Sequence, residues 1–375
     1  MIKRIYHQTN RALISCIGGL LLAGCTDIAT TDKDILELEI VWQYLKIYSI
    51  PAPGKDAVPD NPLLFDTPRQ LAHSINDTLY NDSVFYTDYF YSPGIYLTDN
   101  ALITGSQQNF ATVETKLLSN RTLYVYIKGF DLFQTFDGEV YSTAGELVAI
   151  AQQQAIPENI ILDLRSNPGG LIEVCTSVVD LFIEPQGAYL QATYKTYNSS
   201  TKDTATIPWE IWRANQTGTS SWQNKNVVLL FNANSASAAE IMAAALIDAH
   251  GAKTFSMGQP TFGKGIGQIH IQRPGGYILS VSSLRFRRYL SDSSAAIYHK
   301  KGIAPDTLIA VEDLEDDALL LDLARQKLEG AGFPARRSNL PLHLSKERAR
   351  LAALNPSGYV VVPSAELPPV DTAAP

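Results

Sequence analysis

The chain has 375 residues, of which 45% are hydrophobic and 18% charged, with a formal net charge of −8 at pH 7. This is ordinary globular composition, and its apolar content is enough for a sizeable core in one large domain or in two to three smaller ones. No block of basic residues could neutralise a phosphate backbone, so we expect no nucleic-acid partner.

Residues 1–24 are predicted to be a lipoprotein signal peptide that is removed from the mature chain. They begin with a basic segment carrying Lys3, Arg4 and Arg11, and they continue with an apolar run too short for a membrane span. The run ends in Leu-Ala-Gly before Cys25, which resembles the bacterial lipobox, in which the cysteine is lipidated and becomes the new N-terminus. An ordinary secretory signal with a chance cysteine is the alternative interpretation.

Lipidation of Cys25 would anchor the protein to a membrane of the bacterial cell envelope, facing the periplasm or the exterior. Each acyl methylene buried in the bilayer is worth about 0.8 kcal/mol, so the chains can hold an otherwise soluble protein. Thr26 follows the cysteine and favours the outer over the inner membrane. Because Cys16 leaves with the signal, Cys175 is the single remaining thiol, and its apolar surroundings indicate a core residue.

Helical and aromatic patterns dominate the next part of the chain. Residues 25–33 are polar and are expected to form a tether. Apolar side chains recur with helical spacing over residues 34–50. We expect residues 34–118 to form an N-terminal helical and aromatic region.

A second helix is predicted over residues 66–79 of this region. Asp66 or Thr67 is placed to cap it, and Pro68 takes the first helical position, where its missing N–H costs nothing. Residues 82–100 are rich in aromatic side chains and are predicted to be irregular.

Strand and helix patterns alternate from Arg121 onward, which implies βαβ units around a mostly parallel sheet. We therefore predict an α/β fold with an N-terminal helical segment. A helical segment over residues 311–355 follows the core, and a Pro- and Ala-rich tail over 356–375 is predicted to be disordered. Strands are predicted within 122–130, 159–170, 189–197, 226–231 and 276–290, and helices within 142–156, 171–183, 238–246 and 314–328.

The turn Asn167-Pro168-Gly169-Gly170 lies between a buried strand and a helix. Its two glycines allow backbone conformations that are closed to other residues, so N–H groups can point outward. The start of a helix adds partial positive charge, and the turn is therefore suited to holding an oxyanion. A tight βα turn without a ligand is the alternative.

A second strand-to-helix turn, in "NANSASAAEI", contains Ser235 and Ser237. A serine at such a turn can be a nucleophile, although most serines there only cap the helix. The six histidines are scattered without metal-ligand spacing, and none is placed as a base. Lys264, in "PTFGKGIGQ", could serve as the base if burial lowers its pKa from about 10.4 to near 7–8. A solvated loop lysine is the alternative interpretation.

The order of four motifs, "ILDLRSNPGG", "NANSASAAEI", "PTFGKGIGQ" and "KKGIAPD", resembles the C-terminal processing peptidases, or tail-specific proteases. The resemblance covers residues 119–310. It implies a crotonase/ClpP-like fold, a Ser-Lys dyad that cleaves protein or peptide substrates, and no metal or other cofactor.

The resemblance assigns roles motif by motif. The nucleophile lies three residues before Glu240, which selects Ser237 rather than Ser235, and Lys264 is the base. Gln268 matches a glutamine that orients the lysine in some members. Asp248 also matches a residue implicated in some members, but we expect it to be structural here. The implied oxyanion donors are the backbone N–H groups of Gly169 or Gly170 and of Ala238.

Two departures from the family pattern affect the prediction. The stretch "DAHGAKTFSMG" makes the spacing between Ser237 and Lys264 slightly longer than expected. Residues 93–121 are too few for a PDZ domain, since a domain needs at least about 50 residues. Substrate selection is therefore predicted to rest on a separate adaptor protein or on N-terminal aromatics, which could instead merely pack on the core. These aromatics are Trp42, Tyr44, Tyr80, Phe85, Tyr86, Tyr89, Phe90 and Tyr91.

The sequence thus predicts a lipid-anchored serine endopeptidase of the envelope. A catalytically inactive scaffold or binding lipoprotein on the same fold is the first alternative, and the presence of Ser237, Lys264 and Gln268 together argues against it. An acyl-CoA enzyme of the crotonase type is the second alternative. Export argues against that one, because CoA chemistry is cytoplasmic.

Overall fold

The computed structural model describes residues 25–50, 58–76, 87–91, 96–98, 101–103, 112–134, 140–152, 157–198, 203–215, 222–290, 292, 294–330 and 359–361. The predicted signal peptide over 1–24 lies outside them. The helices are α2 (Cys25–Tyr48), α3 (Pro68–His73), α4 (Thr143–Ala151), α5 (Ile172–Val179), α6 (Ala238–Ala245), the π-helix η2 (Leu246–His250) and α7 (Asp317–Glu329), with short 3-10 turns η1 (Pro62–Leu64), η3 (Gly251–Lys253), η4 (Pro274–Gly276) and η5 (Glu312–Glu315). The strands are β1 (Asp88–Tyr91), β2 (Tyr96–Thr98), β3 (Ala101–Ile103), β4 (Val113–Ser119), β5 (Thr122–Ile127), β6 (Leu132–Gln134), β7 (Val140–Ser142), β8 (Asn159–Asp163), β9 (Ala188–Asn198), β10 (Asp203–Arg213), β11 (Asn226–Phe231), β12 (Thr254–Gly258), β13 (Ile266–Arg273), β14 (Tyr277–Tyr289), β15 (Ala295–Ala296), β16 (Thr307–Leu308) and β17 (Tyr359–Val361).

A six-stranded sheet in the order β16-β12-β11-β8-β5-β4 forms the core. Its strands pair in parallel except for β4, which runs antiparallel to β5. The predicted α/β core with a mostly parallel sheet is therefore confirmed. Every residue of β8 is buried, as expected of a central strand covered on both faces.

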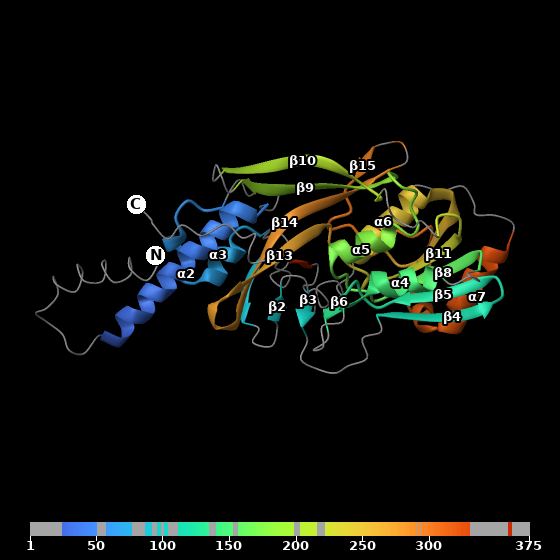
Figure 1. The fold of residues 1–375 in the computed structure, drawn as a ribbon, viewed down its shortest axis with the longest axis horizontal. Coiled ribbons are helices and arrows are strands. Elements are labelled where there is room, and N and C mark those ends of the chain that lie inside the picture. Colours follow the sequence, from blue (N-terminus) through green and yellow to red (C-terminus); the bar gives the residue numbers. More distant parts are fainter. Residues whose placement is uncertain are drawn as a thin grey trace, which may run out of the picture.

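Helices cover both faces of this sheet (Figure 1). Side chains alternate along β8, so Ile160 and Leu162 join the cluster under α4, α5 and α6, whereas Ile161 joins the cluster with α7. From α7, Leu320 and Ala324 are fully buried in that second cluster. The C-terminal helix thus belongs to the core packing.

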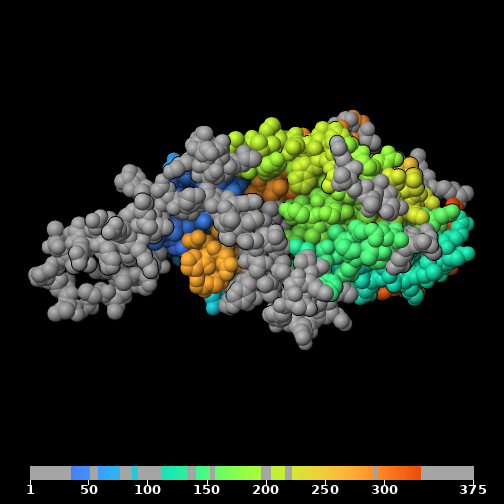
Figure 2. Space-filling view, viewed as in Figure 1, coloured from blue at the N-terminus to red at the C-terminus, as the bar shows by residue number. Residues whose placement is uncertain are grey.

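A second, seven-stranded sheet is mostly antiparallel and was not predicted from the sequence. Its main path is β10-β9-β14-β13, β1 and β15 also pair with β14, and β17 adds a parallel strand to β13. The helices α2 and α3 pack on it through one apolar cluster, in which Leu38 and Leu45 meet Leu279 and Val281. In Figure 2, the blue residues of this N-terminal region lie at one end and the teal and green residues of the core lie at the other.

Several element boundaries differ from the sequence-based expectation. The helix α2 begins at Cys25, so the backbone of the predicted tether is helical, because apolar periodicity marks only the part of a helix that packs. Short strands β1 and β2 fall within the stretch 82–100 that was expected to be irregular, and β17 falls within the predicted disordered tail. The strand β4 extends the core sheet beyond the predicted boundary at residue 119. None of the helices in the described ranges is long and apolar enough to span a membrane.

Candidate active site

The loops that follow β8 and β11 meet at one edge of the core sheet, because these parallel strands are neighbours and their carboxyl ends lie side by side. Several hydrogen bonds join the loops. The N–H of Ala236 donates to the carbonyl of Asn167 at 3.0 Å, and the hydroxyl of Ser235 donates to the carbonyl of Leu164 at 2.7 Å. The glycine turn and the serine turn therefore form one structure.

Ser235 has a structural role in this arrangement. Its hydroxyl is fully buried, donates to Leu164 and accepts the N–H of Asn232 at 3.0 Å. Its carbonyl accepts the N–H of Phe262 at 2.9 Å, which ties in the loop that carries the lysine. Since both hydroxyl functions are in use, Ser235 is poorly suited to attack a substrate.

Ser237 has a different geometry. It is the N-cap residue of α6 and adopts φ +57° and ψ −119°, a backbone conformation that residues other than glycine rarely accept. Strain of this kind at a strand-to-helix turn is what projects a nucleophilic serine toward a substrate. The side chain is largely enclosed but, at 4% exposure, not sealed. The structure thus separates the two serines by conformation and by hydrogen bonding.

The glycine turn lies against Ser237. A Cβ on Gly169 would be 2.8 Å from the Cβ of Ser237 and 3.0 Å from the amide nitrogen of Ala238, so only glycine allows this approach. The N–H of Gly169 donates to the Oδ1 of Asn167 at 2.9 Å. This bond occupies the N–H of Gly169, one of the two glycines predicted as oxyanion donors.

The orientation of Gly170 follows from its parallel bridge to Phe130. This bridge uses the carbonyl of Gly169 and the N–H of Leu171, so the N–H of Gly170 points away from Phe130. Ala238 is the first residue of α6, and N–H groups in the first turn of a helix have no partner within the helix. Neither the bridge nor the hydrogen bonds within α6 thus use these two N–H groups, and their role as oxyanion donors stays a prediction.

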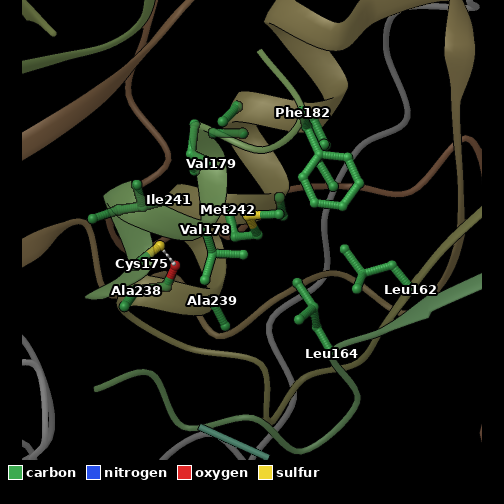
Figure 3. Close-up of a cluster of buried hydrophobic side chains, with 14 of the residues drawn as sticks. Leu162, Leu164, Cys175, Val178, Val179, Phe182, Ala238, Ala239, Ile241 and Met242 are labelled. Carbon is green, nitrogen blue, oxygen red and sulfur yellow. Dashed lines mark hydrogen bonds between the residues drawn. The ribbon is translucent and has the colours of Figure 1, made fainter. Parts of the chain in front are cut away.

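The helices α5 and α6 pack against each other next to the serine turn, and Figure 3 shows Cys175 of α5 beside Ala238 at the start of α6. Cys175 of α5 is fully buried among apolar side chains, and its thiol donates to the carbonyl of Ala238 at 3.1 Å. Burial raises the pKa of this thiol far above its ordinary value, which fits the core role expected from the sequence. Val178, Ala239 and Met242 belong to the same buried cluster (Figure 3).

Lys264 is buried, with 6% of its surface exposed, and is not a solvated loop residue. Burial lowers its pKa to about 7, whereas the negative charge of Glu240 acts in the opposite direction. A lysine with such a pKa is largely neutral slightly above pH 7, and a neutral amine can accept a proton.

Glu240 connects the serine turn to the lysine loop. Its Oε2 accepts the N–H of Ser237 at 3.0 Å and the N–H of Lys264 at 2.6 Å. Because both nitrogens lie within hydrogen-bonding distance of one oxygen, they are within about 6 Å of each other. The longer spacing of this sequence between Ser237 and Lys264 is accommodated in the region of η2 and η3 without separating these two backbones.

The "KKGIAPD" motif braces the lysine loop from the other side. Thr261 and Ile303 exchange two hydrogen bonds, one from the N–H of Ile303 to the hydroxyl of Thr261 at 2.7 Å. The N–H of Lys300 donates to the carbonyl of Gly263 at 2.7 Å. All four sequence motifs thus converge on one place in the fold.

Gln268 is buried on β13, and its amide donates to the hydroxyl of Ser280 at 2.8 Å. Its expected role in orienting Lys264 stays a prediction. Asp248 forms a bidentate ion pair with Arg288 of β14, at 2.6 and 2.7 Å, and its side chain is 2% exposed. This ion pair supports the structural role that we expected for Asp248.

Two histidines lie closer to the lysine than the sequence suggested. His270 is buried and His299 is partly buried, and desolvation lowers their pKa values to about 3 and about 4, with a further contribution from the positive charge of Lys264. Both imidazoles are therefore neutral at physiological pH. The alternation along β13 could have signalled His270, because it shares a sheet face with Gln268. Among the described residues, no three acidic, histidine or cysteine side chains gather in a way that could hold a metal ion.

Comparison with known proteins identifies the family to which the part of the chain with these loops belongs. The family model described as peptidase family S41 matches residues 121–309, just over half of the chain. A Staphylococcus epidermidis protein named "Probable CtpA-like serine protease" is 30% identical over 209 residues, which cover 55% of this chain and 39% of that protein. The "Carboxy-terminal processing protease CtpA" of Bacillus subtilis is 36% identical over 153 residues, 41% of this chain and 29% of that protein.

The chain thus spans about two fifths or less of the curated relatives it matches. The fold is also that of an S41-family protein from Bacteroides fragilis, whose structure aligns with a TM-score of 0.51 at 15% identity and covers 77% of this chain and 97% of that one. Since the family model covers the strands, the helices and the four motif loops described above, this chain belongs to peptidase family S41, the family of the C-terminal processing peptidases.

Proposed function

We propose that this chain is a serine peptidase in which Ser237 is the nucleophile and Lys264 is the general base. The observation that carries the proposal is the shared hydrogen-bond acceptor, Glu240 Oε2, which holds the backbones of both residues together. The strained conformation of Ser237 and the lowered pKa of Lys264 support the same assignment.

The reaction divides into acylation and hydrolysis. Neutral Lys264 accepts the hydroxyl proton of Ser237 as Oγ attacks a peptide carbonyl, and the oxyanion is held by the N–H groups of Gly170 and Ala238. The lysine then donates that proton to the leaving amine as the C–N bond breaks. Water attacks the acyl-enzyme in the second half, with the same base taking its proton. Oxyanion donors of this kind are typically worth 10²–10³-fold in kcat.

We further propose that the enzyme is anchored by lipid at Cys25 and acts on proteins of the cell envelope. The basic segment, the apolar run and the lipobox-like cysteine support this proposal. Labelling cells with a palmitate analogue, followed by purification of the wild type and of Cys25→Ser, tests it. Label on the wild type alone is expected, and equal label on both would exclude lipidation of Cys25.

A serine-reactive phosphonate tests the nucleophile directly. The wild type and Ser235→Ala should be labelled on Ser237, whereas Ser237→Ala should not be labelled. Comparison of C-terminal peptides of envelope proteins between cells with wild-type enzyme and cells with Ser237→Ala would then identify substrates. If the folded wild type takes no label and releases no peptide, an inactive binding lipoprotein becomes the better interpretation.

Substrate selection is expected to depend only weakly on a free C-terminus. Of the N-terminal aromatics, Tyr44 and Tyr89 are buried and Trp42 donates its indole N–H to the carbonyl of Pro59, so these three pack the N-terminal region. Tyr91, by contrast, is 60% exposed and can contact a substrate or an adaptor protein.

Amidating the C-terminus of a cleaved peptide should therefore change kcat/KM by less than about tenfold, or about 1.4 kcal/mol. A loss of roughly a hundredfold would reveal a site that captures a carboxylate. The matched control is the same peptide with its N-terminus acetylated.

A further inference from the structure

Glu240 makes more contacts with the candidate active site than any role as a helix cap requires. Its carboxylate is fully buried. Oε1 accepts the hydroxyl of Thr261 and the N–H of Gly263, both at 2.6 Å, whereas Oε2 accepts the N–H groups of Ser237 and Lys264. One side chain thus holds the serine turn and three residues of the lysine loop.

The four partners of this carboxylate are all donors. Three are backbone N–H groups. The fourth, the hydroxyl of Thr261, accepts the N–H of Ile303, so its own proton is directed at Glu240. A protonated Glu240 would have to place a hydrogen against one of these donors, so the arrangement favours the ionised form, although burial raises the pKa of this carboxyl.

We propose that Glu240 is a positioning residue that sets both the distance between Ser237 and Lys264 and the pH at which Lys264 becomes a base. The inference rests on the proposed function. The carboxylate fixes the two backbones on one oxygen, and its charge favours the protonated lysine, so Glu240 holds the ionisation of Lys264 higher than burial alone would place it. A neutral residue at position 240 could not supply the charge, and a glutamine, with one carbonyl oxygen, could not accept from all four donors.

The substitution Glu240→Gln separates this role from ordinary structural support. The amide nitrogen of glutamine would face two donors, so one pair of contacts is lost and the two loops separate. A displacement of about 1 Å in a catalytic group can cost about 10²-fold, and we expect a loss of that size in kcat with little change in KM. Removal of the negative charge should also move the acid limb of kcat/KM to lower pH by about one unit.

Glu146 provides a matched control. It also lies in the first turn of a helix, and its carboxylate accepts the N–H and the hydroxyl of Thr112 and the N–H of Val113, at 3.2–3.3 Å, away from the serine and lysine loops. Glu146→Gln should lower the thermal midpoint without moving the acid limb. If Glu240→Gln and Glu146→Gln lose kcat equally and have the same pH profile, Glu240 has only a structural role and the proposal is overturned.

A second measurement does not depend on catalysis. The Nζ of Lys264 can be titrated by NMR in protein labelled with ¹⁵N-lysine, in a Ser237→Ala background, with and without Glu240→Gln. A lower pKa of Lys264 in the Glu240→Gln protein is expected, and an unchanged pKa would overturn the electrostatic half of the inference. This titration needs no turnover. Absence of peptidase activity in the wild type would therefore refute the proposed function, while the effect of Glu240 on the pKa of Lys264 could still be measured.

If Glu240→Gln fails to fold, Thr261 supplies the test. Thr261→Val removes the hydroxyl donor to Oε1 but keeps the charge on Glu240, and Thr261→Ser restores the donor. We expect about a tenfold loss of kcat for Thr261→Val, an unmoved acid limb, and recovery for Thr261→Ser. Full activity of Thr261→Val would show that the carboxylate does not position the lysine loop.

Discussion

Two glutamates join distant parts of this molecule, Glu240 in the candidate active site and Glu37 where α2 meets the second sheet. Glu240 is fully buried and accepts hydrogen bonds from three backbone N–H groups and a hydroxyl. Glu37 is 19% exposed and forms a bidentate ion pair with Arg273 at 2.8 and 2.9 Å, while accepting the hydroxyl of Tyr89 at 3.0 Å.

The difference lies in what neutralises each charge. Arg273 keeps its proton at every working pH, so the Glu37 pair is a permanent clamp between α2 and β13. Among the described residues, no arginine donates a hydrogen bond to Glu240, and the cation whose pKa it influences is Lys264, which titrates near pH 7. A buried carboxylate held by neutral donors can therefore tune a lysine, whereas one held by arginine can only hold structure in place.

The largest expected effect is the loss of activity on substitution of Ser237, and Ser235 in the same turn is its natural comparison. The two serines differ in what their hydroxyls contact. Ser237→Ala should reduce kcat by about 10⁴-fold or more, as loss of a nucleophile does, with a near-normal free energy of unfolding. Ser235→Ala should keep most of the activity but lose about 1–3 kcal/mol of unfolding free energy, since the N–H of Asn232 loses its acceptor and the carbonyl of Leu164 keeps only the N–H of Asn167. Peptide hydrolysis and urea unfolding measure the two quantities, and the reverse pattern would mean that the nucleophile is Ser235.

Lys264→Arg should be as inactive as Lys264→Ala, since arginine cannot release its proton. In the wild type, kcat/KM should rise with pH through one ionisation near 7, because the neutral form of Lys264 is the active one and burial lowers its pKa to about 7. A pH–rate profile between 5 and 10 tests both statements. An active arginine variant, or a rate that falls through pH 7, would eliminate lysine as the base.

Lys264→Met should stabilise the fold at neutral and lower pH by roughly 3–5 kcal/mol, because the wild type must bury a charged amine there. Folded Lys264 releases its proton near pH 7 and the unfolded chain near 10.5, so the unfolded state binds more protons between these values. The stability of the wild type therefore rises with pH across this window, and the advantage of the variant should shrink. Denaturant unfolding at pH 6.5 and 9.5 measures the difference, which should be smaller at the higher pH. A difference independent of pH would contradict a lowered pKa.

The clamp should show the smallest effect, and that effect should be confined to stability. Arg273→Gln breaks the bidentate pair with Glu37 and should cost about 2–3 kcal/mol, less than for a fully buried pair because both groups retain some exposure. The kcat should stay within about twofold of the wild type, since the partners of Arg273 among the described residues, Glu37 and Tyr44, lie outside the serine and lysine loops. Loss of activity without loss of stability would link the N-terminal region to catalysis.

The sequence determined the alternation of strands and helices, the mostly parallel core sheet and the four motifs that identify the family. These features are local, because apolar periodicity and turn chemistry are set by residues a few positions apart. The cap of α3 is an example: the sequence offered Asp66 or Thr67, and Thr67 accepts the N–H of Gln70 three residues later. The choice of Ser237 over Ser235 came from the resemblance of one motif to that of the family, and it stays a prediction.

Only the tertiary structure decided the burial of Lys264, the convergence of its loop on Glu240 and the second sheet with its docked helices. Each depends on groups far apart in the chain: 24 residues separate Glu240 from Lys264, and 236 separate Glu37 from Arg273. From the sequence alone, a lysine flanked by glycines is expected to be exposed to solvent. Only the packing of the surrounding loops shows that it is buried. The pKa that would let Lys264 act as a base is thus a property of its surroundings, because desolvation and a neighbouring carboxylate set it.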